Sequence, residues 1–286
     1  MIHFQCQNGL VLDCSHKWVS GQKRISFNFH ENSSLVSLEQ LDIAIPGTIL
    51  VQNLTASFRD NEFIAILGRN GTGKSLTLHT IAGLRDPEKG EIVLGQDNLK
   101  NLKRRQIAIR LSLLTQDSED ILPSNVYDTA SIGRHPHIEP FSGETEKDIK
   151  MTLDSLSKVS LENKLEQDIH SLSGGEKRRL SIAQVLNQNA KIFLLDEPTN
   201  HLDPLYQYQV LDTFKKLTKK NYLVIATMHD PNLISRYADK CLLLYGDGRW
   251  ILGETDDVMN EENLSSLYGI EMQKIRQDDR TLFIAK

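Results

Sequence analysis

The most restrictive stretch of this sequence is an apolar run that ends in a glycine-rich turn. Residues 63–68 read FIAILG, residues 68–75 read GRNGTGKS, and a helical pattern follows over 75–84. The three glycines of the turn let backbone N–H groups converge, because no Cβ hinders the conformations this requires. The start of a helix adds partial positive charge at the same point. Strand, turn and helix in this order fit the phosphate-binding pattern G-x-x-x-x-G-K-[ST].

This phosphate-binding loop predicts the side chains that contact a nucleotide. Lys74 would reach the β- and γ-phosphates of ATP, and Ser75 would hold Mg²⁺ through its hydroxyl group. The alternative is a glycine-rich turn with an incidental lysine, and the flanking strand and helix argue against it. The ATP contacts expected from the loop are Gly68, Arg69, Asn70, Gly71, Thr72, Gly73, Lys74, Ser75 and Leu76.

A second apolar run ends in two carboxylates. Residues 192–196 read IFLLD, so Asp196 would lie at the end of a buried strand, where a charge needs a ligand or a partner. Glu197 follows directly, where it could orient or deprotonate an attacking water. A helix cap before Pro198 is the alternative for this pair, and the complete phosphate-binding loop favours the metal and water roles.

Further short apolar runs predict the fold class. Residues 222–227 (YLVIAT) and 241–245 (CLLLY) lack alternation, which is typical of parallel strands buried on both faces. Helical segments such as 206–220 lie between the runs, and the pattern predicts an α/β sheet with helices on both sides. Residues 90–98 (GEIVLGQDN) instead predict a short antiparallel hairpin with its turn at Gly95.

Charge and composition exclude some classes of function. The formal net charge is −5 and the isoelectric point is about 6.0, so nothing indicates a nucleic-acid-binding protein. Two basic runs, KRR at 103–105 and KRR at 177–179, are predicted to be solvated helix faces.

Cysteine use and hydropathy indicate a reduced, cytoplasmic setting. Cys6, Cys14 and Cys241 lack metal-ligand spacing, and an odd, sparse set favours reduced thiols. His135 and His137 have no companion ligands that would suggest a metal site. No apolar run reaches the roughly 18 residues needed to span a bilayer. The start of the sequence lacks the pattern of a signal peptide.

Six short segments in a fixed order carry a family resemblance. They are the loop at 68–75, LLTQD with Gln116, LSGGE at 172–176, FLLDEP at 193–198, NHLD at 200–203 and TMHD at 227–230. From about residue 37 to its end, the chain resembles the ATPase subunit of an ATP-binding cassette (ABC) transporter. LSGGE argues against a P-loop kinase.

The resemblance implies a fold and a domain organisation. It implies an α/β P-loop NTPase of the ABC-ATPase type, with a RecA-like core, an N-terminal antiparallel β-subdomain and a helical insertion subdomain. The ATPase domain would cover 37–286, with the insertion at about 117–175. Residues 1–36 form an N-terminal extension of unknown role, in which 24–29 (RISFNF) could be a strand.

The resemblance also implies how the site works. Two subunits would pack head to tail as a homodimer, and Ser173, Gly174 and Gly175 would cap the γ-phosphate held by the partner. These residues would begin a helix over 176–188, whose N-terminus favours an anion.

Individual roles carry over to matching positions. Glu197, His229 and Gln116 would be catalytic: Glu197 activates water, His229 contacts the γ-phosphate, and Gln116 touches water and metal. Ser75, Gln116 and Asp196 would hold Mg²⁺. Asp203 would lie at the dimer interface, and Ile45 takes the place of an aromatic residue that stacks on adenine.

Residues 131–156 and 229–272 resemble the ATPases of bacterial importers for iron-siderophores, haem and vitamin B12. This implies a separate integral membrane permease that docks near 116–142, and a periplasmic or lipoprotein solute-binding protein as an indirect partner. The subunit would lie peripherally on the cytoplasmic side of the inner membrane. A non-transport ATPase of the iron-sulfur cluster assembly type, or an exporter ATPase, are the alternatives.

Overall fold

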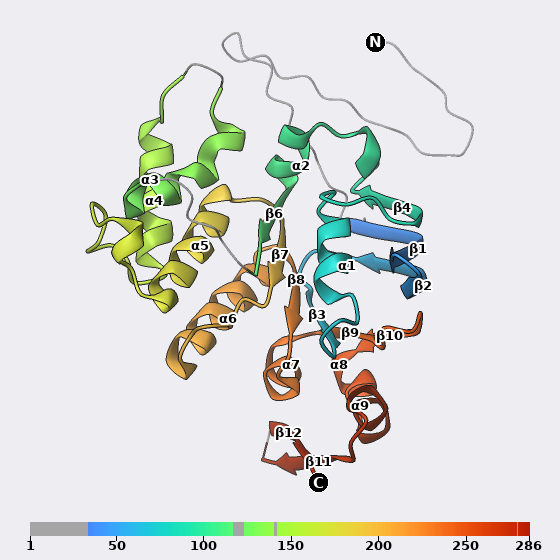
Figure 1. Cartoon of the computed structure of the whole chain (residues 1–286). Coiled ribbons are helices and arrows are strands. Elements are labelled where there is room, and N and C mark those ends of the chain that lie inside the picture. The colour runs from blue at the N-terminus through green and yellow to red at the C-terminus, as the bar shows by residue number, and fades with distance from the viewer. Residues whose placement is uncertain (1–33, 117–122, 140–141, 279) are drawn as a thin grey trace. The chain divides into compact units, whose positions relative to one another are not determined.

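The computed structural model describes residues 34–116, 123–139, 142–278 and 280–286 (Figure 1). The tentative strand at 24–29, together with Cys6 and Cys14, lies outside the described residues. The boundary of the N-terminal extension therefore stays a prediction.

The main sheet has six strands in the order β10-β9-β3-β8-β7-β6. All neighbouring pairs are parallel except β9 with β10, which pair antiparallel. The strands are β3 (Phe63–Gly68), β6 (Leu111–Leu114), β7 (Ile192–Asp196), β8 (Leu223–Met228), β9 (Lys240–Leu244) and β10 (Trp250–Glu254). The four non-alternating runs expected to be strands thus become β3, β7, β8 and β9.

A second, antiparallel sheet has the order β2-β1-β4-β5. Its hairpin β4–β5 turns at Gly95, whose φ of 67° is the left-handed conformation that glycine adopts easily, so the predicted hairpin is confirmed. The strands are β1 (Val36–Ile45), β2 (Thr48–Phe58), β4 (Lys89–Leu94) and β5 (Asp97–Asn98). A separate C-terminal hairpin pairs β11 (Met272–Gln277) with β12 (Arg280–Ala285).

The helices lie between these strands. They are α1 (Lys74–Ile81), α2 (Arg104–Arg110), α3 (Val126–Ser131), α4 (Glu146–Ser157), α5 (Gly174–Gln188), α6 (Pro204–Thr218), α7 (Pro231–Tyr237), α8 (Thr255–Val258) and α9 (Glu261–Tyr268), with short 3₁₀ helices η1 (Leu99–Asn101), η2 (Ile132–His137) and η3 (Ile169–Ser171). In the described part of 117–170 there are helices and no strand. There α3, η2 and α4 pack against α5, on the green-to-yellow side of Figure 1.

The main sheet is buried on both faces, as the non-alternating runs predict. On β3, Phe63 and Leu67 point into one core with the inner sides of α5, α6 and α7, whereas Ile64 and Ile66 point into the other. The second core contains α1 and the antiparallel sheet. Helices therefore lie on both faces, as the sequence predicted, and the antiparallel sheet packs beside α1 on one of them. The inward residues of β1 and β2 are apolar and buried.

Turn chemistry sets the helix boundaries. Helix α1 ends at Ile81 because Gly83 adopts φ 69°, which closes the helix about three residues before the predicted end at 84. Helix α6 begins at Pro204, where a proline is favoured, and the Asp203 side chain accepts a hydrogen bond from the backbone N–H of Tyr206.

The prediction that 177–179 is a solvated face is wrong. Arg178 and Arg179 are only 5% and 8% exposed, because their guanidinium groups reach inward to backbone carbonyl groups. The run at 103–105 is exposed, as predicted. A charge run read along the chain does not show which of its side chains has carbonyl partners in the core.

Candidate active site

The sheet topology brings the predicted site residues to one edge. The phosphate-binding loop follows β3, His229 follows β8, Asp196 and Glu197 lie at the end of β7, and Gln116 follows β6. These four strands are parallel and adjacent in the order β3-β8-β7-β6. Their carboxyl ends therefore meet at one edge of the sheet, which is where open α/β sheets bind ligands.

A cavity of about 680 Å³ opens at this edge. A nucleotide fits a cavity of this size, which is within the range of about 300–1,000 Å³ usual for ligand sites. Its lining joins the loop after β3, residues that follow β6, β7 and β8, and two residues of the antiparallel sheet. The lining residues are Ile45, Leu50, Asn70, Gly71, Gly73, Lys74, Ser75, Leu76, Gln116, Glu197, Asn200 and His229.

Lys74 is held inside the phosphate-binding loop. Its Nζ donates to the carbonyl oxygens of Gly68 at 2.9 Å and Arg69 at 3.2 Å, and the residue is 5% exposed. Burial lowers the pKa of Lys74 below its usual value, while the nearby Glu197 and Asp196 carboxylates act in the opposite direction. An anion beside Nζ would stabilise the charged amine further.

Three predicted loop residues shape the loop without lining the cavity. Thr72 donates its hydroxyl to the Arg69 carbonyl at 2.9 Å, and this bond closes the turn. A Cβ on Gly68 would lie 2.4 Å from the Thr72 hydroxyl and 2.6 Å from the Leu244 carbonyl, so no larger residue fits there. Gly68, Arg69 and Thr72 thus have structural roles in the loop, and backbone contact with phosphate stays a prediction for them.

Asp196 is surrounded by hydroxyl groups. Ser75 Oγ donates to Asp196 Oδ1 at 3.0 Å and Thr227 Oγ1 donates to the same oxygen at 2.6 Å, with Asp196 1% exposed. His79 Nε2 lies 3.8 Å from the other carboxylate oxygen. The hydroxyl of Ser75, the carboxylate of Asp196 and the amide oxygen of Gln116 are hard oxygen donors, which fits the preference of Mg²⁺.

Glu197 occupies a strained backbone position with both carboxylate oxygens engaged. Its φ is 47°, an uncommon value for a residue with a Cβ. Its Oε1 lies 2.5 Å from His229 Nε2, and Asn200 Nδ2 donates to Oε2. These contacts fix the orientation of a carboxylate that lines the cavity but is only 7% exposed.

The serine-glycine segment lies apart from this cavity. Ser173 is the N-cap of α5, and its hydroxyl accepts from the backbone N–H of Glu176. Ser173 and Gly174 are exposed. Among the residues that the structure describes, the cavity lining does not include Ser173, Gly174 or Gly175.

Sequence reasoning missed several residues of the site. Asn200 and Thr227 lie within the quoted NHLD and TMHD segments, yet no role was assigned to them there. Leu50 shares the cavity wall with Ile45, which is 41% exposed. Arg178, assigned to solvent, donates to the carbonyls of Asp196 and Glu197. The contacts of these residues with the site become visible only in the folded chain, where they lie close to the carboxyl ends of the strands.

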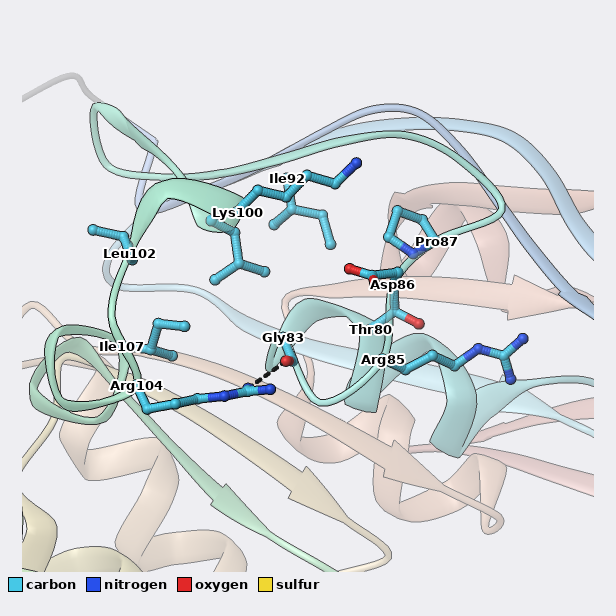
Figure 2. Close-up of a pocket in the computed structure, with 11 residues that line it drawn as sticks. Thr80, Gly83, Arg85, Asp86, Pro87, Ile92, Lys100, Leu102, Arg104 and Ile107 are labelled. Carbon is cyan, nitrogen blue, oxygen red and sulfur yellow. Dashed lines mark hydrogen bonds between the residues drawn. The ribbon is translucent and has the colours of Figure 1, made fainter.

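A second cavity, of about 340 Å³, lies away from the strand ends (Figure 2). Figure 2 shows the Arg104 guanidinium pointing toward Gly83, to whose carbonyl it donates a hydrogen bond. Ile92, Leu99 and Ile107 form apolar lining, with Lys100 among the basic residues at the edge. None of these residues is among those that line the first cavity.

The chain was compared with known proteins. The family described as ABC transporter matches residues 51–200. The chain is 31% identical to the hemin import ATP-binding protein HmuV of Pseudomonas aeruginosa, across 86% of this chain and 97% of that protein. It is 30% identical to the ferric enterobactin transport ATP-binding protein FepC of Escherichia coli, across 81% and 86%. A solved metal-chelate type ABC transporter in an inward-facing conformation matches with a TM-score of 0.77 and 28% identity, covering 89% of this chain and 98% of that one.

A phosphate-binding loop after β3, buried carboxylates at the end of β7 and a nucleotide-sized cavity define a P-loop ATPase. The chain belongs to the ABC transporter family, within which it resembles ATP-binding subunits. The resemblance found in the sequence and the predicted fold class are confirmed. Among the described residues, every helix is too short or too polar to traverse a lipid bilayer.

Proposed function

We propose that this chain is the ATP-hydrolysing subunit of a bacterial ABC importer that takes up an iron-siderophore, haem, cobalamin or a similar substrate through a separate permease. The observation that carries the enzymatic part is the convergence of Lys74, Ser75, Gln116, Glu197 and His229 on one cavity. The import function is supported by relatives named for hemin import, ferric enterobactin transport and cobalamin import.

The geometry supports a division of labour within the site. Lys74 and the loop backbone would bind the phosphates, and Ser75, Asp196 and Gln116 would hold Mg²⁺, which would supply positive charge to neutralise the phosphates. Glu197 accepts the proton of the attacking water. His229 Nε2 lies 2.5 Å from Glu197 Oε1, where it would orient that carboxylate, and it lines the cavity that would hold the γ-phosphate.

Each ATP would be shared between two copies of the chain. Ser173 and Gly174 are exposed at the start of α5 and lie outside their own cavity, where the helix N-terminus would meet an anion held by a partner. The backbone N–H and hydroxyl of Ser173, which donate to Glu176 Oε2 within the chain, would turn to that anion. Asp203, which caps α6, would lie at the same dimer interface. Ile45 would contact the adenine base through its exposed aliphatic side chain.

The permease would dock over the cavity of Figure 2. Apolar lining with Arg85, Lys100 and Arg104 at its edge suits a short amphipathic segment that carries acidic residues. Arg105 donates to the carbonyls of Pro136 and Ile138, which joins this face to the segment 116–142. The subunit would then lie peripherally on the cytoplasmic side of the inner membrane, with a solute-binding protein as an indirect partner.

The test is the variant Glu197→Gln. It keeps the size and polarity of the side chain but removes the basic carboxylate, so ATP affinity should be retained while turnover falls by roughly 100-fold or more. ATP should then accumulate in a stable dimer, which size-exclusion chromatography with Mg²⁺ would detect. Turnover at the wild-type rate would contradict the water-activating role.

The same variant tests import. Cells that lack this chain would be supplied with the wild-type chain or with Glu197→Gln, and uptake of labelled ferric chelate, haem and cobalamin would be measured. If the chain powers import, the wild-type chain should restore uptake of one of these substrates and Glu197→Gln should not. The import function would be overturned if cells without the chain took up all three substrates normally. Loss of iron-sulfur enzyme activity or of substrate efflux in those cells would instead support one of the alternative functions.

A further inference from the structure

Arg178 lies at the junction of three parts of the site. It belongs to α5, five residues after Ser173, and is 5% exposed. Through Nη1 it donates to the carbonyls of Thr115 at 2.6 Å and Gln116 at 3.2 Å. Through Nη2 it donates to the carbonyls of Asp196 and Glu197, both at 2.6 Å. One side chain thus joins the ends of β6 and β7 to α5.

A buried guanidinium group is costly unless its N–H groups are satisfied. The two terminal nitrogens of Arg178 donate to four carbonyl acceptors, which lie on two separate segments of backbone. The planar fork of arginine can serve two such segments at once in fixed directions. A lysine ammonium is a compact charge on a flexible side chain, so it cannot hold the two backbone segments in the same geometry.

The backbone of Glu197 needs such support. Its φ of 47° persists only if surrounding contacts hold it. The N–H of Glu197 donates to Thr227 Oγ1 at 2.9 Å, and its carbonyl accepts from Arg178 at 2.6 Å. The residue is therefore fixed on both sides of its Cα, which sets the direction of its carboxylate.

We propose that Arg178 is a positioning residue, which fixes the distance between the Gln116 segment and Glu197 so that both act on the same water. This rests on the proposed ATPase roles of those two residues. Arg178 also transmits the position of α5, because Ser173 at the start of that helix would contact the ATP of the partner subunit. Each active site would then respond to the nucleotide held across the dimer.

The test is Arg178→Lys, with Arg134→Lys as the matched control. Arg134 is also buried, at 4% exposed, and also bridges helices, through Asp148 Oδ1 at 2.9 Å and the Asn187 carbonyl at 2.8 Å. Its partners lie outside the active-site cavity. Both variants replace a buried fork by an ammonium group, so a general loss of stability affects both.

We expect Arg178→Lys to lower kcat by roughly 10- to 100-fold, the scale of a misplacement of about 1 Å, with KM for ATP changed less than about twofold. Arg134→Lys should keep kcat near the wild-type value. Without nucleotide, hydrogen exchange in peptides containing 115–116 and 196–197 should accelerate in Arg178→Lys and stay unchanged in Arg134→Lys.

Other outcomes would overturn the proposal. They are an unchanged kcat in Arg178→Lys, an equal fall in both variants, or a rise in KM that matches the fall in kcat. If Arg178→Lys does not fold, the uncharged Arg178→Gln carries the same test. A wild-type chain without ATPase activity would instead defeat the proposed function, so the two failures are distinguishable.

Discussion

Glu176 places a negative charge beside the residues proposed to meet a partner's phosphate. Lys164 Nζ lies 2.7 Å from Glu176 Oε1, and the backbone N–H and hydroxyl of Ser173 both donate to Oε2 at 2.9 Å. These interactions, with Lys164 first, lower the pKa of Glu176 to about 2. Lys164 thus offsets a charge that would otherwise repel the γ-phosphate.

Removing Lys164 should change how Glu176 titrates. Because the pKa of Glu176 is lower in the folded chain than its ordinary value of 4.5, the ionised carboxylate stabilises the fold at pH values above 4.5. This stabilisation is lost as the pH falls from 4.5 towards about 2. In Lys164→Ala the pKa should rise towards 4.5 and stability at pH 7 should fall by less than about 1 kcal/mol, since the pair is partly exposed. NMR titration of the Glu176 carboxyl group measures this, with Lys150→Ala as control. An unchanged titration would refute the assignment.

At the scale of elements, the helical region is fastened to α5 by close backbone contact. A Cβ on Gly133 of η2 would lie 2.3 Å from the carbonyl of Gln184 on α5. His137 Nε2, at the end of η2, lies 2.7 Å from the Gln188 carbonyl. Helix α5 and η2 are therefore packed together, which would let permease contacts near 116–142 act on α5.

Gly133→Ala should separate η2 from α5. The added methyl group cannot fit without moving a helix backbone, so we expect a loss of about 1–3 kcal/mol in the free energy of unfolding. Gly143→Ala is the control, because its Cβ would meet no atom within 4 Å and should change stability by less than about 0.5 kcal/mol. Chemical denaturation compares the two. Equal denaturation midpoints for Gly133→Ala and Gly143→Ala would show that Gly133 does not lie this close to the backbone of α5.

At the scale of the whole molecule, the phosphate-binding loop and the serine-glycine segment serve different nucleotides in the proposed dimer. The exposed Ser173 lies outside the cavity that Lys74 lines, so one chain offers two half-sites. A two-fold pair would complete both at once.

Mixing two inactive variants should restore activity. Lys74→Ala removes the phosphate contact, Ser173→Arg blocks the opposite half-site, and each variant alone has no intact composite site. Their mixed dimer retains one, so random mixing should recover about a quarter of wild-type ATPase activity. A coupled ATPase assay over a mixing series measures this. No recovery at any ratio would mean that nucleotide is not shared between subunits.

Local patterns in the sequence determined much of this protein. Apolar runs without alternation gave four strands of the main sheet, and the spacing in 68–75 gave the loop together with Lys74 and Ser75. These signals need only neighbours along the chain, because strand periodicity, glycine turns and helix starts are short-range properties.

Tertiary structure alone decided which distant groups meet. The order β3-β8-β7-β6 brings Asn200 and Thr227 to the carboxylates, and it turns Arg178 from an expected surface charge into a buried bridge. It also placed the antiparallel sheet beside α1 in the core on one face of the main sheet. Side chains far apart in sequence find their partners only after strand order and register are fixed, and both follow from packing of the whole chain.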